Sequence, residues 1–269
     1  MKKKIQLNKF DTLVERLVSE FIKIPNFDLV STDELANRVF NIITFRIADV
    51  ISYKELVCQH FIPATNKAIF ESKKDFQNSR YKFLLTTKNL DFTETLYDTI
   101  RLAYVGLFHK LENYINDVIK IPDLIFSELY ETEGTVASWA KQKFNFDIKD
   151  WQQFSITHEI NWICNCVKHK DGLPIKEPKP NRFKYSDATQ RIKITPEEFK
   201  QDCESLIKFY PLYLQTMVIF AQHKLATEKP LVKENYKYSP ELYDKQVENL
   251  NNVQKAVEKF IELLKQMKE

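Results

Sequence analysis

The 269-residue chain contains only three glycines, Gly106, Gly134 and Gly172. An average protein carries roughly 7% glycine, which would be several times as many. Glycine supplies the left-handed backbone conformations that tight hairpins and phosphate-binding loops need, and other residues reach them at a steric cost. The scarcity of glycine therefore favours long helices with few special turns. The chain also has no G-x-G-x-x-G, P-loop or G-x-S-x-G string, which excludes the commonest nucleotide-binding and acyl-transfer motifs.

The rest of the composition is that of a globular protein. Hydrophobic residues make up 43% of the chain and aromatic residues 13%, which is too much for a disordered chain. The 40 lysines and arginines nearly balance the 37 acidic residues. A balance of this kind neither requires nor excludes a nucleic-acid partner, because a basic groove can lie on a neutral protein.

Two features bear on location. Three lysines follow Met1, but no apolar region comes after them, and no uncharged apolar stretch of about 18 residues occurs. We therefore expect no secretory signal and no membrane partner. The four cysteines, Cys58, Cys164, Cys166 and Cys203, form no C-x-x-C pair, and a chain of this size does not need disulfides. These observations favour a reduced, cytoplasmic protein.

Apolar residues spaced three and four apart predict helices along most of the chain. The expected helices cover residues 10–21, 31–56, 64–88, 91–121, 123–131, 135–144, 150–170, 195–227 and 240–268. Prolines at 25, 63 and 122 are expected to separate neighbouring helices, and Pro211 is expected to bend the helix that contains it. Alternating side chains at 182–185 and 191–194 predict a small β-hairpin. We therefore expect an all-α protein with one small β-hairpin.

Two short signals mark helix ends. The run Thr195–Glu198 predicts a helix start, because a threonine cap is followed by a proline and then by a glutamate three residues on. Gly172 predicts the end of the helix over 150–170, since the left-handed conformation closes many helices.

The most chemically suggestive stretch is residues 161–172, N-W-I-C-N-C-V-K-H-K-D-G. Cys164, Cys166 and His169 suggest a zinc site at first, but on a helix Cys164 points about 200° away from Cys166. Two thiolates on opposite sides of one helix cannot close a tetrahedral site. We therefore expect buried cysteines and neither a metal nor a cofactor. A Ser or Cys hydrolase has no local signature in the chain.

A third interpretation concerns the end of this helix. Asn165 and His169 are four residues apart and therefore share a face, with Lys168 adjacent. The carbonyl-rich C-terminus of a helix favours a protonated imidazole, which can donate a proton to a departing oxygen. A neighbouring cation can hold a phosphate, and the 2′-hydroxyl of RNA serves as the nucleophile. The pattern is compatible with metal-independent RNA cleavage, although a histidine at a helix end is more often a cap or a solvated side chain.

The run 163–172 resembles the signature of the HEPN superfamily, in which an R-x4-6-H motif ends a helix of a four- or five-helix bundle. A common bacterial form of the motif is R-N-C-x-V-H-N-x-G. The positions that fit its frame are Asn165, Cys166, His169 and Gly172. The resemblance covers residues 92–225 in approximate terms.

The similarity continues outside the motif. The predicted hairpin and the run Ile194–Phe199 follow the motif as in the family. The run His109–Tyr114 is similar to the family's first long helix, which often carries an inward acidic residue. The resemblance implies three parts: an N-terminal helical region over 1–90, a HEPN-like bundle over 91–228 and a C-terminal helix over 229–269.

The chain departs from the family at one position. Cys164 stands five residues before His169, where the family has its arginine. In active members that arginine is thought to bind the phosphate and stabilise the transition state. A cysteine is uncharged or anionic and too short to do either. A point charge from a neighbouring position replaces a guanidinium fork poorly, and the candidate substitutes are Lys168, Lys170, Arg182 and Arg191.

The resemblance implies two alternative functions. In the first, the chain is a metal-independent endoribonuclease of a bacterial defence or toxin–antitoxin system, with His169 as general acid or base, oriented by Asn165, and Glu112 in the same cleft. The phosphates of the RNA are then bound by Lys168, Lys170 and Arg182. In the second, the chain is a catalytically silent module that binds RNA, a nucleotide or a partner protein. HEPN proteins commonly pair, so a homodimer is implied, as is a protein partner such as an antitoxin.

Overall fold

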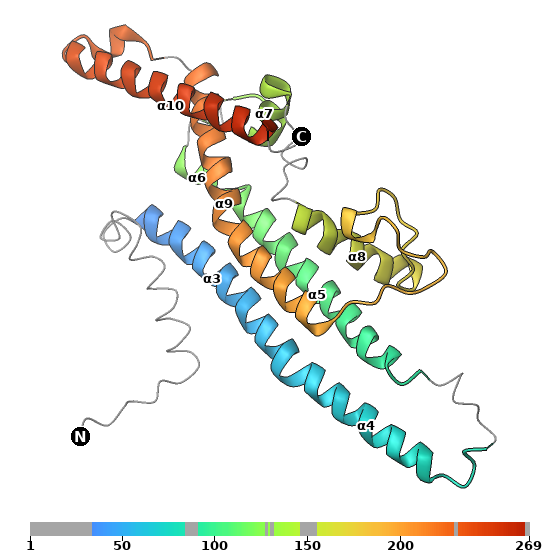
Figure 1. Cartoon of the computed structure of the whole chain (residues 1–269). Coiled ribbons are helices and arrows are strands. Elements are labelled where there is room, and N and C mark those ends of the chain that lie inside the picture. The colour runs from blue at the N-terminus through green and yellow to red at the C-terminus, as the bar shows by residue number, and fades with distance from the viewer. Residues whose placement is uncertain are drawn as a thin grey trace, which may run out of the picture.

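The computed structural model describes residues 34–83, 91–126, 129, 132–145, 155–228 and 231–266. Within these ranges the chain is mostly helical and contains no β-strand, which confirms the all-α class. The longer helices are α3 (Glu34–Leu56), α4 (Ile62–Asn78), α5 (Glu94–Val118), α8 (Ser155–Lys170), α9 (Pro196–Glu228) and α10 (Pro240–Gln266) (Figure 1). The shorter elements are η1 (Val57–Phe61), α6 (Ile121–Ile125), α7 (Val136–Phe144), η6 (Asn181–Phe183) and η7 (Lys233–Tyr236). The helix expected over 10–21 lies outside the described residues.

α3, η1 and α4 follow one another without a break. The prediction that Pro63 separates two helices is wrong, because Pro63 lies in the first turn of α4. Directly before it, η1 is a π-helix in which the N–H of Ile62 bonds to the carbonyl of Val57. Proline has no N–H, and its ring crowds the carbonyl four residues earlier, so the wider π turn gives Pro63 room in a continuous helix. α4 ends at Asn78, earlier than the expected limit of 88.

The core of the bundle lies between α5, α9 and the helices packed on them. α8 packs against α5, and α3 packs against both α5 and α9 (Figure 1). The rings of Tyr114 and Tyr210 stack with their centroids 3.6 Å apart, and Tyr104 meets Phe199 edge-on at 5.3 Å. All four side chains are buried. Large aromatic side chains at the α5–α9 interface therefore supply much of the apolar area that stabilises the bundle.

The α3–α5 contact depends on a glycine. A Cβ atom at Gly106 would lie 2.0 Å from the hydroxyl oxygen of Tyr53 and 2.5 Å from the ring carbon that carries it. Tyr53 donates a hydrogen bond from this hydroxyl to the carbonyl of Ala103 over 3.0 Å. Gly106 thus allows a tyrosine of α3 to lie directly on the backbone of α5.

The expected β-hairpin is not confirmed, since residues 173–195 form turns and the short helix η6 instead of paired strands. The alternation of side chains has another cause. Phe183 turns inward and stacks on Trp162 of α8, with centroids 4.9 Å apart, and Ile192 and Ile194 are buried. Each inward side chain packs separately onto α8 and its neighbours, so alternation arises without a ladder of backbone hydrogen bonds.

The two helix-end signals predicted at Thr195 and Gly172 are confirmed. Thr195 accepts a hydrogen bond from the N–H of Glu198 over 3.2 Å, and the Glu198 carboxylate accepts one from the N–H of Thr195 over 2.7 Å. This is the capping box that starts α9. Gly172 follows α8 with a φ of +76°, in the left-handed region. α9 continues past Pro211 to Glu228.

α7 and α10 pack against the C-terminal part of α9 (Figure 1). Among the α10 side chains that the structure describes, Val257 and Ile261 are buried apolar ones. Among the helices of the described ranges, none combines the length and the apolar character that a membrane span requires.

Candidate functional site

α8 runs without interruption to Lys170 and presents different residues on different sides. Its buried positions are Ile160, Trp162, Ile163, Cys164 and Cys166. In its last turn Lys168, His169 and Lys170 are exposed, and Asn165, one turn before His169, is half-buried. The imidazole and the amide expected to act together are therefore both on an accessible part of the helix.

The helix closes by a tight backbone turn. Asp171 and Gly172 both have positive φ, +52° and +76°, and the N–H of Gly172 donates to the carbonyl of Cys166 over 2.9 Å. A Cβ atom at Gly172 would lie 3.1 Å from Cδ of Arg101. Glycine is favoured here both by the backbone conformation and by the close approach of an arginine from α5.

Asn165 uses its amide group within α8. Its Nδ2 donates to the backbone carbonyl of Asn161 over 2.8 Å and to the side-chain oxygen of Asn161 over 2.6 Å. These two bonds hold the amide against the preceding turn of the helix. The contacts of Asn165 therefore give no support to the role of orienting His169.

Cys164, which the resemblance aligns with the arginine of the HEPN motif, is 1% exposed and lies near Glu112 of α5. Burial raises the pKa of its thiol; the ammonium of Lys168 acts to lower it, and the carboxylate of Glu112 acts to raise it. The thiol is therefore neutral at physiological pH and is not an activated nucleophile. Glu112 and Lys168, two of the predicted site residues, thus lie close to Cys164.

Lys168 reaches toward α5. Its Nζ lies 5.7 Å from the centroid of the Phe108 ring, a cation–π distance. Glu112, also on α5, pairs through its carboxylate with Nδ1 of His109 over 3.1 Å. The structure therefore brings Lys168 and Glu112 together at the α5–α8 interface, beside the thiol that stands in the arginine's place.

Arg182 is held by acidic side chains. Its guanidinium lies 2.9 Å from Asp202, 3.0 Å from Glu198 and 3.6 Å from Glu159, and its side chain is 24% exposed. Burial acts to lower the pKa of Arg182, but the nearby Asp202, together with Tyr104 and Glu198, raises it above its ordinary value. With three carboxylates around it, Arg182 anchors the segment after α8 to α9 and has little charge left for a phosphate.

A cavity of ≈ 350 Å³ lies beside this cluster, between the start of α8 and α9. Glu159, Asp202 and Lys208 are the charged residues that line it. Burial and the neighbouring Asp202 raise the pKa of Glu159, while Arg182 acts to lower it. Both carboxylates face Arg182, so the charges around the cavity are largely satisfied within the protein.

Positive charge is concentrated in the last turn of α8 and in the residues that follow this helix. We define the basic segment as residues 168–193, which contain eight lysines and arginines and three acidic residues, whereas the whole chain has 40 and 37. Lys170, Lys184 and Lys193 are exposed. Tyr185 is 91% exposed, and Nζ of Lys184 lies 5.7 Å from the centroid of its ring. The basic segment thus presents cations and an aromatic ring to solvent.

The two cysteines of α8 have different surroundings. Cys164 lies near Lys168 of α8 and Glu112 of α5. Cys166 lies near Lys176 of the basic segment. Burial raises the pKa of both thiols. In the part of the chain that the structure describes, no group of three or more histidine, cysteine or acidic side chains is placed to hold a metal ion.

Comparison with known proteins adds no relative, because no family model, curated protein or solved structure matches the chain. The HEPN resemblance therefore rests on the motif residues of the sequence alone.

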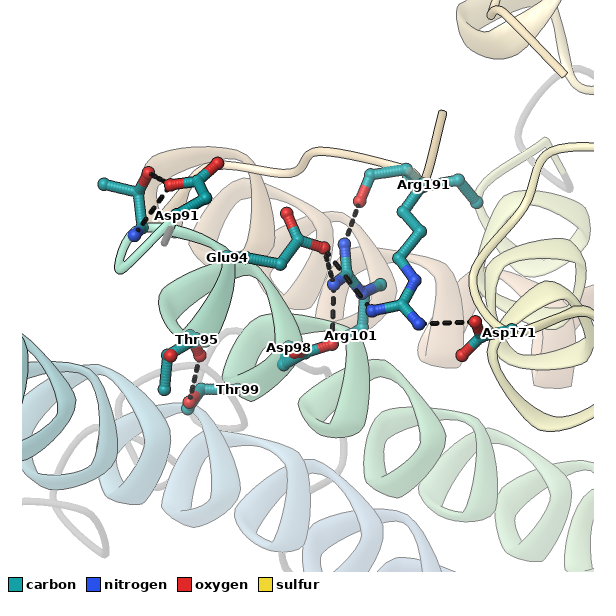
Figure 2. A network of polar contacts seen from close by, with 10 residues as sticks. Asp91, Glu94, Thr95, Asp98, Thr99, Arg101, Asp171 and Arg191 are labelled. Atoms are coloured by element: carbon teal, nitrogen blue, oxygen red, sulfur yellow. Dashed lines mark hydrogen bonds and ion pairs between the residues drawn. The ribbon is translucent and has the colours of Figure 1, made fainter. Parts of the chain in front are cut away.

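Arg101 is the residue of this region that the sequence reasoning missed. It lies on α5, is 2% exposed, and contacts the turn that ends α8 (Figure 2). A signal was present, because Arg101, Tyr104, Phe108 and Leu111 follow one another at helical spacing along the inward face of α5. A charged side chain in such a stripe needs partners, and its partners predict where neighbouring segments attach.

Proposed function

We propose that this chain is a HEPN-like helical module that binds RNA through the basic segment and does not cut it. The observation that carries the proposal is the concentration of exposed positive charge around the end of α8, in a protein whose overall charge is nearly balanced. Lysines and arginines bind the phosphates of RNA and supply most of the affinity in non-specific binding.

The exposed side chains of the basic segment fit a single-stranded polyanion. Lys170, Lys184 and Lys193 are exposed, so solvent-borne phosphates can reach them. The Nζ atom of Lys193 also lies 5.9 Å from the centroid of the Tyr97 ring. Tyr185, with Lys184 beside its ring, offers an aromatic surface on which an unpaired base stacks. The positive charge that binds phosphates therefore comes from lysine side chains.

The same geometry argues against cleavage. The arginine that the family uses at the scissile phosphate is replaced by a buried, neutral thiol at Cys164. Of the predicted substitutes, Arg182 is surrounded by three carboxylates. Lys168 lies beside Cys164 and over the Phe108 ring, but a lysine supplies a point charge and not a guanidinium fork. Transition-state stabilisation depends on donors held in place beforehand, and a forked donor like the family's arginine is missing at Cys164.

A metal-independent ribonuclease remains the second candidate, because one observation favours it. His169 is exposed at the end of an unbroken helix, with Asn165 on the same side one turn earlier. An accessible imidazole at a helix C-terminus retains the capacity for proton transfer. Incubation of RNA with the protein in EDTA tests this candidate: degradation that disappears in His169→Ala supports the nuclease, and intact RNA supports the binding module.

RNA binding is tested by fluorescence anisotropy with a labelled single-stranded oligouridylate. The double variant Lys170→Glu, Lys184→Glu is expected to bind at least about tenfold more weakly than the wild type, because it reverses two phosphate-contacting charges. Lys73→Glu, Lys74→Glu on α4 is the matched control, since both lysines are exposed and the net charge changes equally. Equal losses in the two double variants would show that only net charge matters and would contradict the proposed surface.

The resemblance also carries proposals about context. A bacterial defence or toxin–antitoxin role, a cytoplasmic location, a homodimer that joins two α8 helices, and a protein partner such as an antitoxin all follow from the family. Sedimentation velocity at several concentrations measures the oligomeric state directly. A monomer at every concentration would remove the homodimer from this set.

A further inference from the structure

We propose that Arg101 is a positioning residue that holds the basic segment in its binding shape without touching the RNA. This inference rests on the proposed RNA-binding function. It identifies a buried residue of α5, outside the segment, as a determinant of affinity.

The first support is the set of bonds that Arg101 makes (Figure 2). Its Nη1 donates to the backbone carbonyl of Ile192 over 2.8 Å. Its Nη2 pairs with Asp98 over 2.6 Å and also with Glu94, both on α5. Because the side chain is only 3% exposed, Arg101 cannot contact a phosphate of RNA. It acts only through the residues that it binds.

The second support is the way the two ends of the basic segment meet at this arginine. The N–H of Ile192 donates to the carbonyl of Gly172 over 2.8 Å, so the chain closes on itself at these two residues. Arg101 binds the carbonyl of Ile192, and its Cδ lies where a Cβ on Gly172 would make a 3.1 Å contact. A single side chain therefore contacts both sides of the closure.

A second arginine reinforces the closure from outside. Arg191 pairs with Asp171, directly before Gly172, and its Nη1 lies 3.8 Å from the Glu94 carboxylate that also binds Arg101 (Figure 2). Arg191 is 38% exposed and Asp171 is 76% exposed, so this outer pair is screened by solvent and is expected to stabilise weakly. Of the two arginines, Arg101 is the buried one, and its contacts therefore hold the closure between Gly172 and Ile192 more firmly.

The consequence for binding is entropic. A loop whose ends are fixed at Gly172 and Ile192 keeps Lys184 and Tyr185, which lie between them, in place before RNA arrives. A released loop must instead be ordered at the moment of binding. Loss of Arg101 is therefore expected to reduce affinity although no contact with RNA is removed. The effect differs from that of a surface lysine, which contributes a phosphate contact directly.

The test compares Arg101→Met with the wild type in the same oligouridylate titration, repeated at several salt concentrations. The expected result is a loss of about tenfold in affinity with an unchanged slope of log K against log salt, because no phosphate contact is lost. Hydrogen exchange at the amides of Gly172 and Ile192 is expected to become faster. Glu94→Gln is a second variant that weakens both arginine contacts, in case Arg101→Met does not fold.

Arg46→Met is the matched control, because Arg46 pairs with Asp117 over 2.6 Å on another part of the bundle. It is expected to leave both the affinity and the exchange at Gly172 unchanged. If Arg101→Met lowers the melting temperature but binds RNA as the wild type does, Arg101 is only a stabilising residue and the inference is overturned. A salt slope reduced by about one would instead indicate a direct phosphate contact and would also overturn it.

Failure of the proposed function gives a different result. Wild-type protein that does not bind the oligouridylate at low salt contradicts RNA binding itself. Exchange at Gly172 and Ile192 then still decides the structural part of the inference: faster exchange in Arg101→Met supports the closure, and unchanged exchange overturns it.

Discussion

At the scale of single residues, two positions determine how close the helices come and what chemistry they retain. Gly106 lets Tyr53 lie on the backbone of α5, and Cys164, which the HEPN resemblance aligns with a catalytic arginine, is a small buried thiol. Both effects follow from side-chain size. A larger residue at either position has to displace a neighbour in a close-packed interior.

Gly106→Ala is expected to destabilise the protein by about 1–3 kcal/mol, because the added methyl overlaps the Tyr53 ring. Urea unfolding followed by circular dichroism measures the change. Tyr53→Leu combined with Gly106→Ala removes the clashing ring, so the double variant is expected to lose less than the sum of the two single variants. Strict additivity would show that the two residues do not meet.

Thiol labelling tests the burial of the arginine-equivalent position. Cys58 is partly exposed, whereas Cys164, Cys166 and Cys203 are buried, and burial raises the pKa of all four thiols. In the native protein at pH 8, iodoacetamide is expected to modify Cys58 first and the other three only on unfolding. Mass spectrometry of peptides gives the order, and early modification of Cys164 would contradict its place in the α5–α8 interface.

At the scale of secondary-structure elements, signals that act over a few residues were predictable from the sequence. The capping box of α9 and the glycine that ends α8 are confirmed, since both depend on local hydrogen bonds and backbone conformation. The hairpin predicted after α8 depended on a distant partner, whereas the predicted break at Pro63 was wrong because of a local backbone feature. A π turn admits the proline, and Trp162 draws Phe183 out of any strand pairing.

The same limit applies to the candidate site. Exposure of His169 and proximity of Lys168 to Cys164 follow from helical spacing on α8. The engagement of Arg182 with Asp202 joins residues from two distant elements, and so does the closure at Arg101. Spacing along one helix cannot predict which distant charges meet.

The junction of α7, α9 and α10 is expected to respond to pH. His223 is 2% exposed, its Nε2 has no hydrogen-bond partner among the described residues, and the ring lies 5.3 Å from Trp139 and 5.4 Å from Phe144. Burial lowers the pKa of His223 below its ordinary 6.5; Glu258 of α10 acts to raise it and Lys143 of α7 to lower it.

Because the folded pKa is lowered, the unfolded chain takes up a proton first as the pH falls. Stability is therefore fully present above pH 6.5 and decreases as the pH drops through the folded pKa. His223→Phe is expected to show a smaller loss of unfolding free energy between pH 7 and pH 5, measured by urea titration at each pH. His109→Gln is the control, since His109 is 58% exposed. Equal pH dependence in His223→Phe and the wild type would contradict this account.

At the scale of the whole molecule, long helices form one bundle and charge is distributed unevenly over it. Tyrosine and phenylalanine side chains fill the α5–α9 core, and the basic segment lies outside that core, attached to α8 by Trp162 and to α5 by Arg101. The scarcity of glycine predicted the helical architecture, but the composition alone could not predict where the positive charge gathers.

The central claim is that RNA binds at the basic segment and leaves intact. Hydrogen exchange of the wild-type protein with and without a single-stranded oligouridylate in EDTA tests it most directly. The account predicts slower exchange within residues 168–193 and RNA of unchanged length at the end of the incubation. Slower exchange confined to α4 or α10, no change in exchange at saturating RNA, or RNA shortened by the wild type but not by His169→Ala would contradict it.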